Sequence, residues 1–385
     1  MSEPCLLMAG GGTGGHVFPL LAVADALREL SPSLRLVFVG TERGLERDLV
    51  PARGYQLEVL PVQPLRGAGA LGVARGVALA GKAVLSGRRL LGQYRPRAVF
   101  SVGGYAAGPV ALAAFTARVP LALLEPNADI GLANRWVSRF VSRAYVGFPE
   151  THRFFNAARV LETGVPLRSG FVPSELPPSD GVARILVLGG SQGAKTLNQS
   201  VPRALSRLGL PVRVVHQCGR AHLAETQALY AELGMAAQVV VTPFIDDMNR
   251  ALSDSELVIG RAGAGAVGEI CAVGRPSLLV PYPFAGDHQR FNAVSLERRG
   301  AARLVLAPEA TPERLQAELS TLLGDRARMV EMGRAARALG RLDAALAIAR
   351  DLLALAGLSD PAEAARGGVA APSPPVASFS LSEVA

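Results

Sequence analysis

Residues 10–16 read GGGTGGH and follow a short apolar run, residues 5–9, that is typical of a buried strand. A second glycine-rich turn, GGSQG at residues 189–193, follows the apolar run 185–188. Each turn precedes a segment whose apolar residues recur at helical spacing. A strand that ends in glycines and opens a helix presents unpaired backbone N–H groups at the positive end of the helix dipole, which favours phosphate. Two such turns predict two Rossmann-like α/β domains that face each other across a cleft.

Strands and helices alternate along both halves of the 385-residue chain, which is long enough for two domains. Further strands are predicted at residues 34–39, 57–62, 98–102, 120–124, 143–147, 212–216, 238–242, 257–260, 277–280 and 302–306. This alternation is typical of parallel, doubly wound sheets. We place the N-terminal domain over residues 1–163 and the C-terminal domain over 164–339. A last helical stretch is expected at 337–357, and the tail 359–385, which has few large apolar residues, is expected to be disordered.

The net charge of +8 is concentrated in one part of the chain. Residues 59–124 contain no Asp or Glu but eight Lys or Arg, so the rest of the chain is neutral overall. Within this part, the basic segment 65–97 interleaves its charges with Leu and Val, which favours an anionic membrane surface. One alternative is a solvated Arg-rich helix that packs its apolar side inward. Nucleic acid is a weaker alternative, because the segment lacks stacking aromatic residues apart from Tyr94.

Cysteine, histidine and apolar patterns exclude several classes of protein. Cys5, Cys218 and Cys271 lie far apart, so we expect buried thiols in a reducing compartment. The uncharged run 98–117 is divided by glycines and Pro109 into strand, loop and helix, so we do not expect it to span a membrane. The N-terminus lacks the basic region of a signal peptide, and we expect a cytoplasmic protein. No histidine cluster has metal-ligand spacing, so we expect neither a metal nor a cofactor.

The first glycine-rich turn allows more than one interpretation. Residues 10–15 and 263–268 match the dinucleotide pattern GxGxxG, but Glu42 is only a loose candidate for the acidic residue that an NAD site needs. An NAD-dependent oxidoreductase is therefore a weak alternative. His16 follows the turn directly, where its imidazole could accept a proton near neutral pH. It could equally be a histidine that only satisfies a backbone group.

The second half carries two further candidate binding segments. Residues 261–269 read RAGAGAVGE, and their small side chains would let a ligand approach the backbone. Glu269 could accept hydrogen bonds from two ribose hydroxyls, or it could merely cap the first helical turn. After the next strand come four polar residues that could bind sugar hydroxyls: Asp287, His288, Gln289 and Asn292.

Nine motifs along the chain occur in the order of one known family. They are GGTGGHVFP at 11–19, GGY at 103–105, EPN at 125–127, the pair Pro166 and Arg168, GGSQGA at 189–194, HQCG at 216–219, FIDDM at 244–248, RAGAGAVGE at 261–269 and QRFNA at 289–293. In this combination the chain resembles the MurG family of bacterial peptidoglycan glycosyltransferases over about residues 5–357. It departs from the commonest pattern in reading LEPN at 124–127, where many members have HEQN, and in having Ala262 in place of Ser.

The resemblance implies a GT-B glycosyltransferase architecture and an inverting hexosyltransferase. The expected reaction moves N-acetylglucosamine from UDP-GlcNAc to the 4-hydroxyl of lipid I and forms lipid II for peptidoglycan. A C-terminal helix at about 340–357 is expected to return to the N-terminal domain. The resemblance also implies peripheral attachment to the cytoplasmic side of the cell membrane, which agrees with the basic segment 65–97.

The resemblance further implies the binding residues. Arg168, Glu269 and the backbone of Ile245 are expected to hold the uridine part of the donor, and Ser191 is expected near the diphosphate. The donor pocket would be lined by Ala264, Gly265, Ala266, Val267, Gly268 and Glu269. Gln289 and Asn127 would contact the sugar, and Thr13, Gly14 and Gly15 would close the pocket near the acceptor diphosphate. Our candidate for the general base is His16.

Three other functions stay open on sequence alone. The first is another lipid-directed UDP-sugar transferase of the same architecture, such as a diacylglycerol glycosyltransferase. The second is a UDP-GlcNAc epimerase, which would convert the donor with no acceptor present. The third is a membrane-docked sensor that binds a UDP-sugar without turnover.

Overall fold

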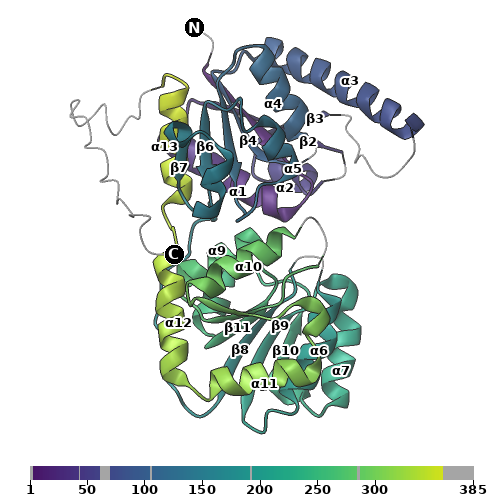
Figure 1. Cartoon of the computed structure of the whole chain (residues 1–385), viewed down its shortest axis with the longest axis vertical. Helices are drawn as coiled ribbons and strands as arrows, with labels where there is room; N and C mark the ends of the chain where they lie inside the picture. Colours follow the sequence, from purple (N-terminus) through teal and green to yellow (C-terminus); the bar gives the residue numbers. More distant parts are fainter. Residues whose placement is uncertain are drawn as a thin grey trace, which may run out of the picture.

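The structure is a computed structural model that describes residues 3–42, 44–60, 70–104, 106–190, 193–283 and 287–358, with the backbone alone for residues 70–80. The tail 359–385, Ser191 and the start of the basic segment 65–97 lie outside these residues. The described chain forms two α/β halves, one above the other in Figure 1, each built on its own sheet of parallel strands. The predicted fold class is thereby confirmed.

The N-terminal half is built on a sheet with strand order β3-β2-β1-β4-β5-β6-β7. Its strands are β1 (Cys5–Gly10), β2 (Arg35–Thr41), β3 (Gln56–Leu60), β4 (Ala98–Gly103), β5 (Leu121–Glu125), β6 (Arg143–Val146) and β7 (Val160–Glu162). Its helices are α1 (Gly14–Leu30), α2 (Glu46–Ala52), α3 (Ala70–Tyr94), α4 (Ala107–Thr116) and α5 (Leu132–Val137), with short 3-10 turns η1 (Pro149–Phe154) and η2 (Ala157–Arg159). The strand order reverses between β1 and β4, so the first glycine-rich turn lies at the point where ligands bind in such sheets.

The C-terminal half repeats this design with strand order β10-β9-β8-β11-β12-β13. Its strands are β8 (Ala183–Leu188), β9 (Val212–Gln217), β10 (Val239–Thr242), β11 (Leu257–Gly260), β12 (Ser277–Leu279) and β13 (Ala302–Leu304). Its helices are α6 (Lys195–Leu205), α7 (Leu223–Glu232), α8 (Met248–Ser253), α9 (Ala264–Val273), α10 (His288–Arg298), α11 (Pro312–Leu323) and α12 (Arg326–Leu339), with short 3-10 turns η3 (Arg220–His222), η4 (Ala236–Gln238) and η5 (Ala307–Glu309). Here the order reverses between β8 and β11, which precede the second glycine-rich turn and the segment 261–269.

The central strands β1, β4, β5, β8, β11 and β12 are buried on both faces, because they are apolar at nearly every position. In β1, Leu6 and Met8 pack in one core with α1, while Leu7 and Ala9 pack in the opposite core with α3 and α4. In β8, Leu186 packs with α8 and α9. Ile185 and Val187, which point to the opposite face, pack with α6 and α11. The period of two along each strand thus places helices on both sides of each sheet.

The end of the chain crosses from the C-terminal half to the N-terminal half. The predicted helical stretch 337–357 begins too early, because its first residues belong to α12, which ends at Leu339, and α13 (Ala344–Leu355) begins after a break. Gly340 has extended backbone at this break, and a Cβ there would lie 2.7 Å from the Cys271 carbonyl oxygen. Beyond the break α13 packs against α1 in the N-terminal core, as its course in Figure 1 shows.

Most predicted strands are confirmed within a few residues, and β7 is the strand that the sequence analysis missed. This strand is only three residues long and two of them are exposed, so it has neither an apolar run nor an alternation. The three cysteines are buried and form no disulfide, as expected. No helix among the described residues is long and apolar enough to cross a membrane.

Candidate active site between the two halves

The first glycine-rich turn presents His16 near the start of α1. The backbone N–H groups of His16 and Val17 both donate to the Thr13 carbonyl oxygen over 3.1 Å, and the Thr13 hydroxyl lies 3.4 Å from His16 Nδ1. Burial lowers the pKa of His16, and His288 of the other half acts in the same direction. The imidazole is therefore neutral at neutral pH, which is the state that accepts a proton.

The turn after β4 packs directly against the first glycine-rich turn. Gly104 has a φ of +90°, and a Cβ there would lie 2.5 Å from the Gly11 carbonyl oxygen. Only glycine fits this position, since the conformation is left-handed and the two backbones touch. Gly104 of this motif therefore helps to shape the N-terminal side of the site.

The second glycine-rich turn rests on a buried polar network. Gly193 has a φ of +77°, and a Cβ there would collide with the Cys218 carbonyl oxygen, which accepts a bond from Asn198 Nδ2 over 3.0 Å. The Oδ1 of Asn198 lies 3.1 Å from Nε2 of His216, whose Nδ1 lies 2.9 Å from the Tyr230 hydroxyl. Burial lowers the pKa of His216 to about 3, so this histidine is neutral and structural. Through these contacts the HQCG motif supports the second glycine-rich turn.

Arg168 and Glu269, both predicted to bind the uridine part of a donor, lie together in the C-terminal half. Arg168 Nε is 3.8 Å from Glu269 Oε1, and Glu269 is on α9, five residues after its start. Burial raises the pKa of Glu269 to about 7, while the Arg168 charge acts in the opposite direction. Ile245 is buried nearby in the same core as Val267, and its backbone N–H and C=O make no hydrogen bond with the described part of the chain. A planar base could therefore pair with that backbone edge.

Asn127 of the N-terminal half is held by a buried carboxylate. Glu125, at the end of β5, accepts hydrogen bonds from Asn127 N and Nδ2 over 3.0 and 3.1 Å. Its other oxygen accepts from Gly131 N and Asn134 Nδ2, each over 2.9 Å. Burial raises the pKa of Glu125, and these bonds act in the opposite direction. Thus Glu125 fixes the loop in which this chain reads LEPN, and it leaves Asn127 Oδ1 free to face the other half.

Asn292 joins this loop to the C-terminal half. It is fully buried, and its Nδ2 donates to Asn127 Oδ1 over 3.1 Å and to the Ala262 carbonyl oxygen over 2.9 Å. Its Oδ1 accepts from Ala128 N over 2.7 Å. Gln289, one turn earlier on α10, accepts a bond from Tyr282 N over 2.9 Å. Asn127 thus lies at a contact between the halves with Asn292, and Gln289 lies one turn earlier on the same helix as Asn292.

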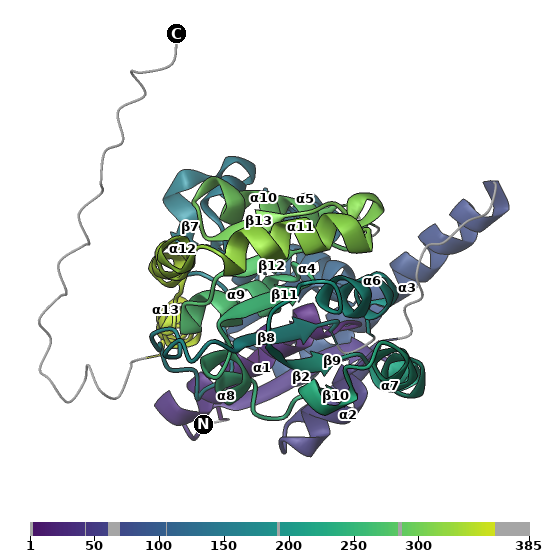
Figure 2. The same ribbon diagram turned by 90° about the horizontal axis from the view of Figure 1, so that it is seen from below.

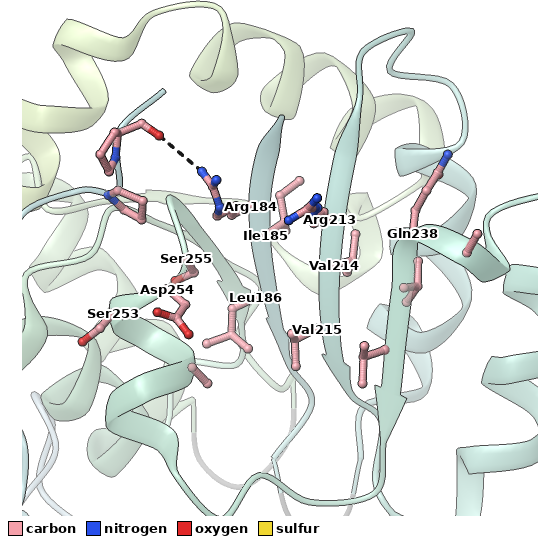
Figure 3. A pocket seen from close by; sticks show the side chains of 16 residues that line it. Arg184, Ile185, Leu186, Arg213, Val214, Val215, Gln238, Ser253, Asp254 and Ser255 are labelled. Carbon is pink, nitrogen blue, oxygen red and sulfur yellow. Dashed lines mark hydrogen bonds between the residues drawn. The ribbon is translucent and has the colours of Figure 1, made fainter. Parts of the chain in front are cut away.

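Of two cavities, one lies between the halves and the other lies away from the predicted site residues. A small one, of about 60 Å³, lies between the halves and is lined by Val267 and Gly268 of α9 together with Phe148 and Val165. A groove of about 730 Å³ lies on the C-terminal sheet beside α8, where Figure 3 shows side chains of β8, β9 and β10 lining it. No described residue of the predicted site lines this groove. In the described ranges, no group of three or more His, Cys, Asp or Glu is placed to hold a metal ion.

Comparison with known proteins gives a consistent result over most of the chain. Residues 6–146 match the glycosyltransferase family 28 N-terminal domain, and residues 184–348 match the C-terminal domain of that family. The chain is 50% identical over 357 residues to the UDP-N-acetylglucosamine–N-acetylmuramyl-(pentapeptide) pyrophosphoryl-undecaprenol N-acetylglucosamine transferase of Sorangium cellulosum, covering 91% of this chain and 88% of that protein. It is 43% identical to the protein of the same name from Methylococcus capsulatus, covering 91% and 99%.

Solved structures show the same relationship. The crystal structure of MurG from Acinetobacter baumannii matches with a TM-score of 0.76 at 33% identity, covering 92% of this chain and 99% of that one. A UDP-N-acetylglucosamine 2-epimerase matches with a TM-score of 0.63 at 14% identity, covering 92% and 97%. At that identity the second likeness shows a shared fold alone.

Proposed function

The chain belongs to glycosyltransferase family 28, and from that premise we propose how its two halves carry out the reaction. It transfers N-acetylglucosamine from UDP-GlcNAc to the 4-hydroxyl of lipid I and forms lipid II, the reaction named for relatives that are 41–50% identical over about 90% of the chain. The observation that carries the proposal is the contact of Asn127 in the N-terminal half with Asn292 in the C-terminal half, which also holds the pair Arg168 and Glu269, in a chain so similar to these enzymes.

In our proposal the donor binds to the C-terminal half. The uracil pairs with the backbone of Ile245, the ribose hydroxyls donate to Glu269, and Arg168 steadies that carboxylate. The start of α9, Ala264 to Gly268, faces the donor with small side chains and a helix N-terminus. Ser191 and its turn would bind the diphosphate, and Gln289 with Asn127 would bind the sugar. Thr13, Gly14 and Gly15 would close the site from the N-terminal half.

The chemical step is a displacement at the anomeric carbon. The acceptor 4-hydroxyl oxygen forms a bond to C1 of the α-linked sugar, the bond between C1 and the diphosphate oxygen breaks, and the configuration inverts to β. The hydroxyl proton passes to His16, which is neutral because burial lowers its pKa. The electron pair leaves on UDP, whose developing charge is stabilised by backbone N–H groups at helix starts.

The N-terminal half offers a surface suited to an anionic membrane. We define the apolar–basic face by exposed residues of α3, α4, α5 and the residues just after these helices: Leu85, Arg88, Arg89, Leu112, Phe115, Arg118, Leu132, Arg135, Trp136, Arg139 and Phe140. The three helices are neighbours, since Arg88 bonds Thr116 over 3.2 Å and the rings of Phe115 and Phe140 lie 4.4 Å apart. In Figure 2 α3 extends well away from both halves. We propose peripheral binding on the cytoplasmic side of the cell membrane through this face.

Acceptor dependence tests the proposed function. Purified protein is incubated with UDP-GlcNAc, with and without a soluble lipid I analogue, and released UDP is measured. We expect release only with the acceptor. Conversion of the donor in the absence of acceptor would favour an epimerase, and donor binding without any turnover would favour a sensor.

A further inference from the structure

Glu46, the first residue of α2, is buried beneath the first glycine-rich turn with 1% of its surface exposed. Its Oε2 accepts a hydrogen bond from Gly12 N over 2.8 Å. Its Oε1 accepts from both the backbone N and the hydroxyl of Thr41, at the end of β2, each over 2.8 Å. The carboxylate therefore joins the turn to the neighbouring strand.

The space around Glu46 is shaped by glycines from both sides. A Cβ on Gly11, Gly40 or Gly44 would collide with the Glu46 side chain. Any larger residue at these positions would force the carboxylate to move or the turn to shift. The absence of three side chains thus makes room for one carboxylate under the turn.

This arrangement changes how the first turn can act. The Gly12 N–H points at Glu46 and is not free for a phosphate, unlike the expectation for a glycine-rich turn. The carboxylate also favours the protonated form of His16, and the Gly11 backbone does the same. His288, from α10 of the other half, has the opposite effect on the pKa of His16.

We propose that Glu46 is a positioning residue for the acceptor side of the reaction: through Gly12 it fixes the glycine-rich turn that leads into α1, the helix that carries His16. This inference rests on the proposed function, because it assigns Glu46 a role in that same transfer. Glu46 does not touch substrate and acts only through the turn and through His16.

The substitution Glu46→Gln tests the contact with little change in volume. A glutamine oxygen at the Oε1 position would keep both bonds from Thr41, and its NH₂ group would then face the Gly12 N–H, so two donors would meet. We expect kcat/KM for the lipid I analogue to fall on the order of 100-fold. The two donors repel each other and displace the turn, and a displacement of about 1 Å can reduce the rate by that factor. The KM for UDP-GlcNAc should stay within about twofold of the wild-type value, because the donor is bound by the other half.

The pH dependence of kcat/KM separates the effect of the Glu46 charge from the effect of the position of its side chain. Loss of the Glu46 charge should move the acid limb of kcat/KM to lower pH, because His16 then gives up its proton more easily. Gly44→Ala should displace the Glu46 side chain while leaving it charged. We therefore expect this second variant to lose acceptor kcat/KM as well, but with a smaller shift of the acid limb.

Glu58→Gln is the matched control, since Glu58 lies on β3 of the same sheet and its Oε1 accepts bonds from Gln56 and Tyr94, away from the turn. The Glu58→Gln variant should keep wild-type kinetics. For every variant, calorimetric binding of UDP-GlcNAc serves as the check that the protein is folded. Wild-type acceptor kcat/KM and an unmoved acid limb in folded Glu46→Gln would overturn the proposal while leaving the function intact. Absence of acceptor-dependent turnover in the wild-type protein would instead contradict the function itself.

Discussion

The side chain of Asn292 in the C-terminal half donates a hydrogen bond from Nδ2 to Oδ1 of Asn127 in the N-terminal half, over 3.1 Å. Asn292 also satisfies the Ala262 carbonyl and the Ala128 N–H, so one fully buried side chain holds both halves at the site where the donor sugar is proposed to lie. We therefore expect donor binding and the contact between the two halves to be coupled through this one amide.

We predict that Asn292→Ala weakens both the donor site and the contact between the halves. The KM for UDP-GlcNAc should rise at least tenfold, which corresponds to about 1.4 kcal/mol. Thermal unfolding should begin at lower temperature, because the Ala128 N–H and the Ala262 carbonyl lose their partner in a buried place. The control is Asn249→Ala, which removes one bond to Val172 N away from this contact and should leave the KM unchanged. Equal KM values for the two variants would contradict the coupling.

Glu269 makes donor affinity depend on pH. Burial raises its pKa to about 7, so the carboxylate is largely protonated below that pH. Because the ionised form accepts the ribose hydroxyl bonds in our proposal, affinity for UDP-GlcNAc should rise by up to about tenfold per pH unit toward pH 7 and then level off. Calorimetric titration between about pH 5.5 and 8.5 measures this rise. Glu269→Gln should bind more weakly with little pH dependence, and an unchanged slope in that variant would assign the titration to another group.

The apolar–basic face should control binding to vesicles. Arg88→Glu combined with Arg89→Glu should weaken binding to phosphatidylglycerol-containing vesicles at least tenfold, since each basic residue near such a surface contributes about 1 kcal/mol. Trp136→Ser should also weaken binding, because the side chain is 76% exposed and available for insertion. Turnover of a soluble acceptor should not change in either variant.

The matched control for this face is a charge reversal in the other half. Arg328 and Arg334 are exposed on α12, and their replacement by Glu changes the net charge by the same amount. If that pair reduced vesicle binding as strongly as Arg88→Glu with Arg89→Glu, net charge alone would explain the binding and the proposed face would be wrong.

Arg275 should be the most costly single residue to remove from the C-terminal half. It is fully buried, and its guanidinium donates to the backbone carbonyls of residues 174–175 and 252–253 and to the Ser174 hydroxyl. Arg275→Met should lower the free energy of unfolding by about 3 kcal/mol, because several buried acceptors lose their donor together. Urea unfolding measures this loss, and the exposed Arg213→Met serves as control with an expected change below about 0.5 kcal/mol. A similar small change for Arg275→Met would show that solvent replaces the guanidinium without cost.

The fold could be predicted from the sequence because its signals are local. Two apolar runs ending in glycines, each followed by helical spacing, predict the β1–α1 and β8–α6 units, and the structure contains both. The break between α12 and α13 could not be predicted in the same way. Gly340 is a weak local signal, and what fixes the break is its close approach to Cys271 on a distant helix.

Parts of the candidate site were not visible in the sequence for a similar reason. Glu46 looks like an ordinary acid in the first turn of a helix, and only the fold brings it to Gly12, which is 34 residues away. Trp136 and Phe140 lie well beyond the basic segment 65–97, so a search of one segment could not join them to it. Periodicity predicts which face of an element is buried, but not which distant element it meets.

The identity of the product distinguishes the proposed transfer from the alternative reactions. The protein is incubated with UDP-GlcNAc and the soluble lipid I analogue, and the product is purified and examined by mass spectrometry and NMR. We predict an acceptor heavier by one N-acetylhexosamine, joined to the 4-position of its N-acetylmuramyl unit in the β configuration. An α linkage, a different position of attachment, or a modified donor with unchanged acceptor would contradict the account.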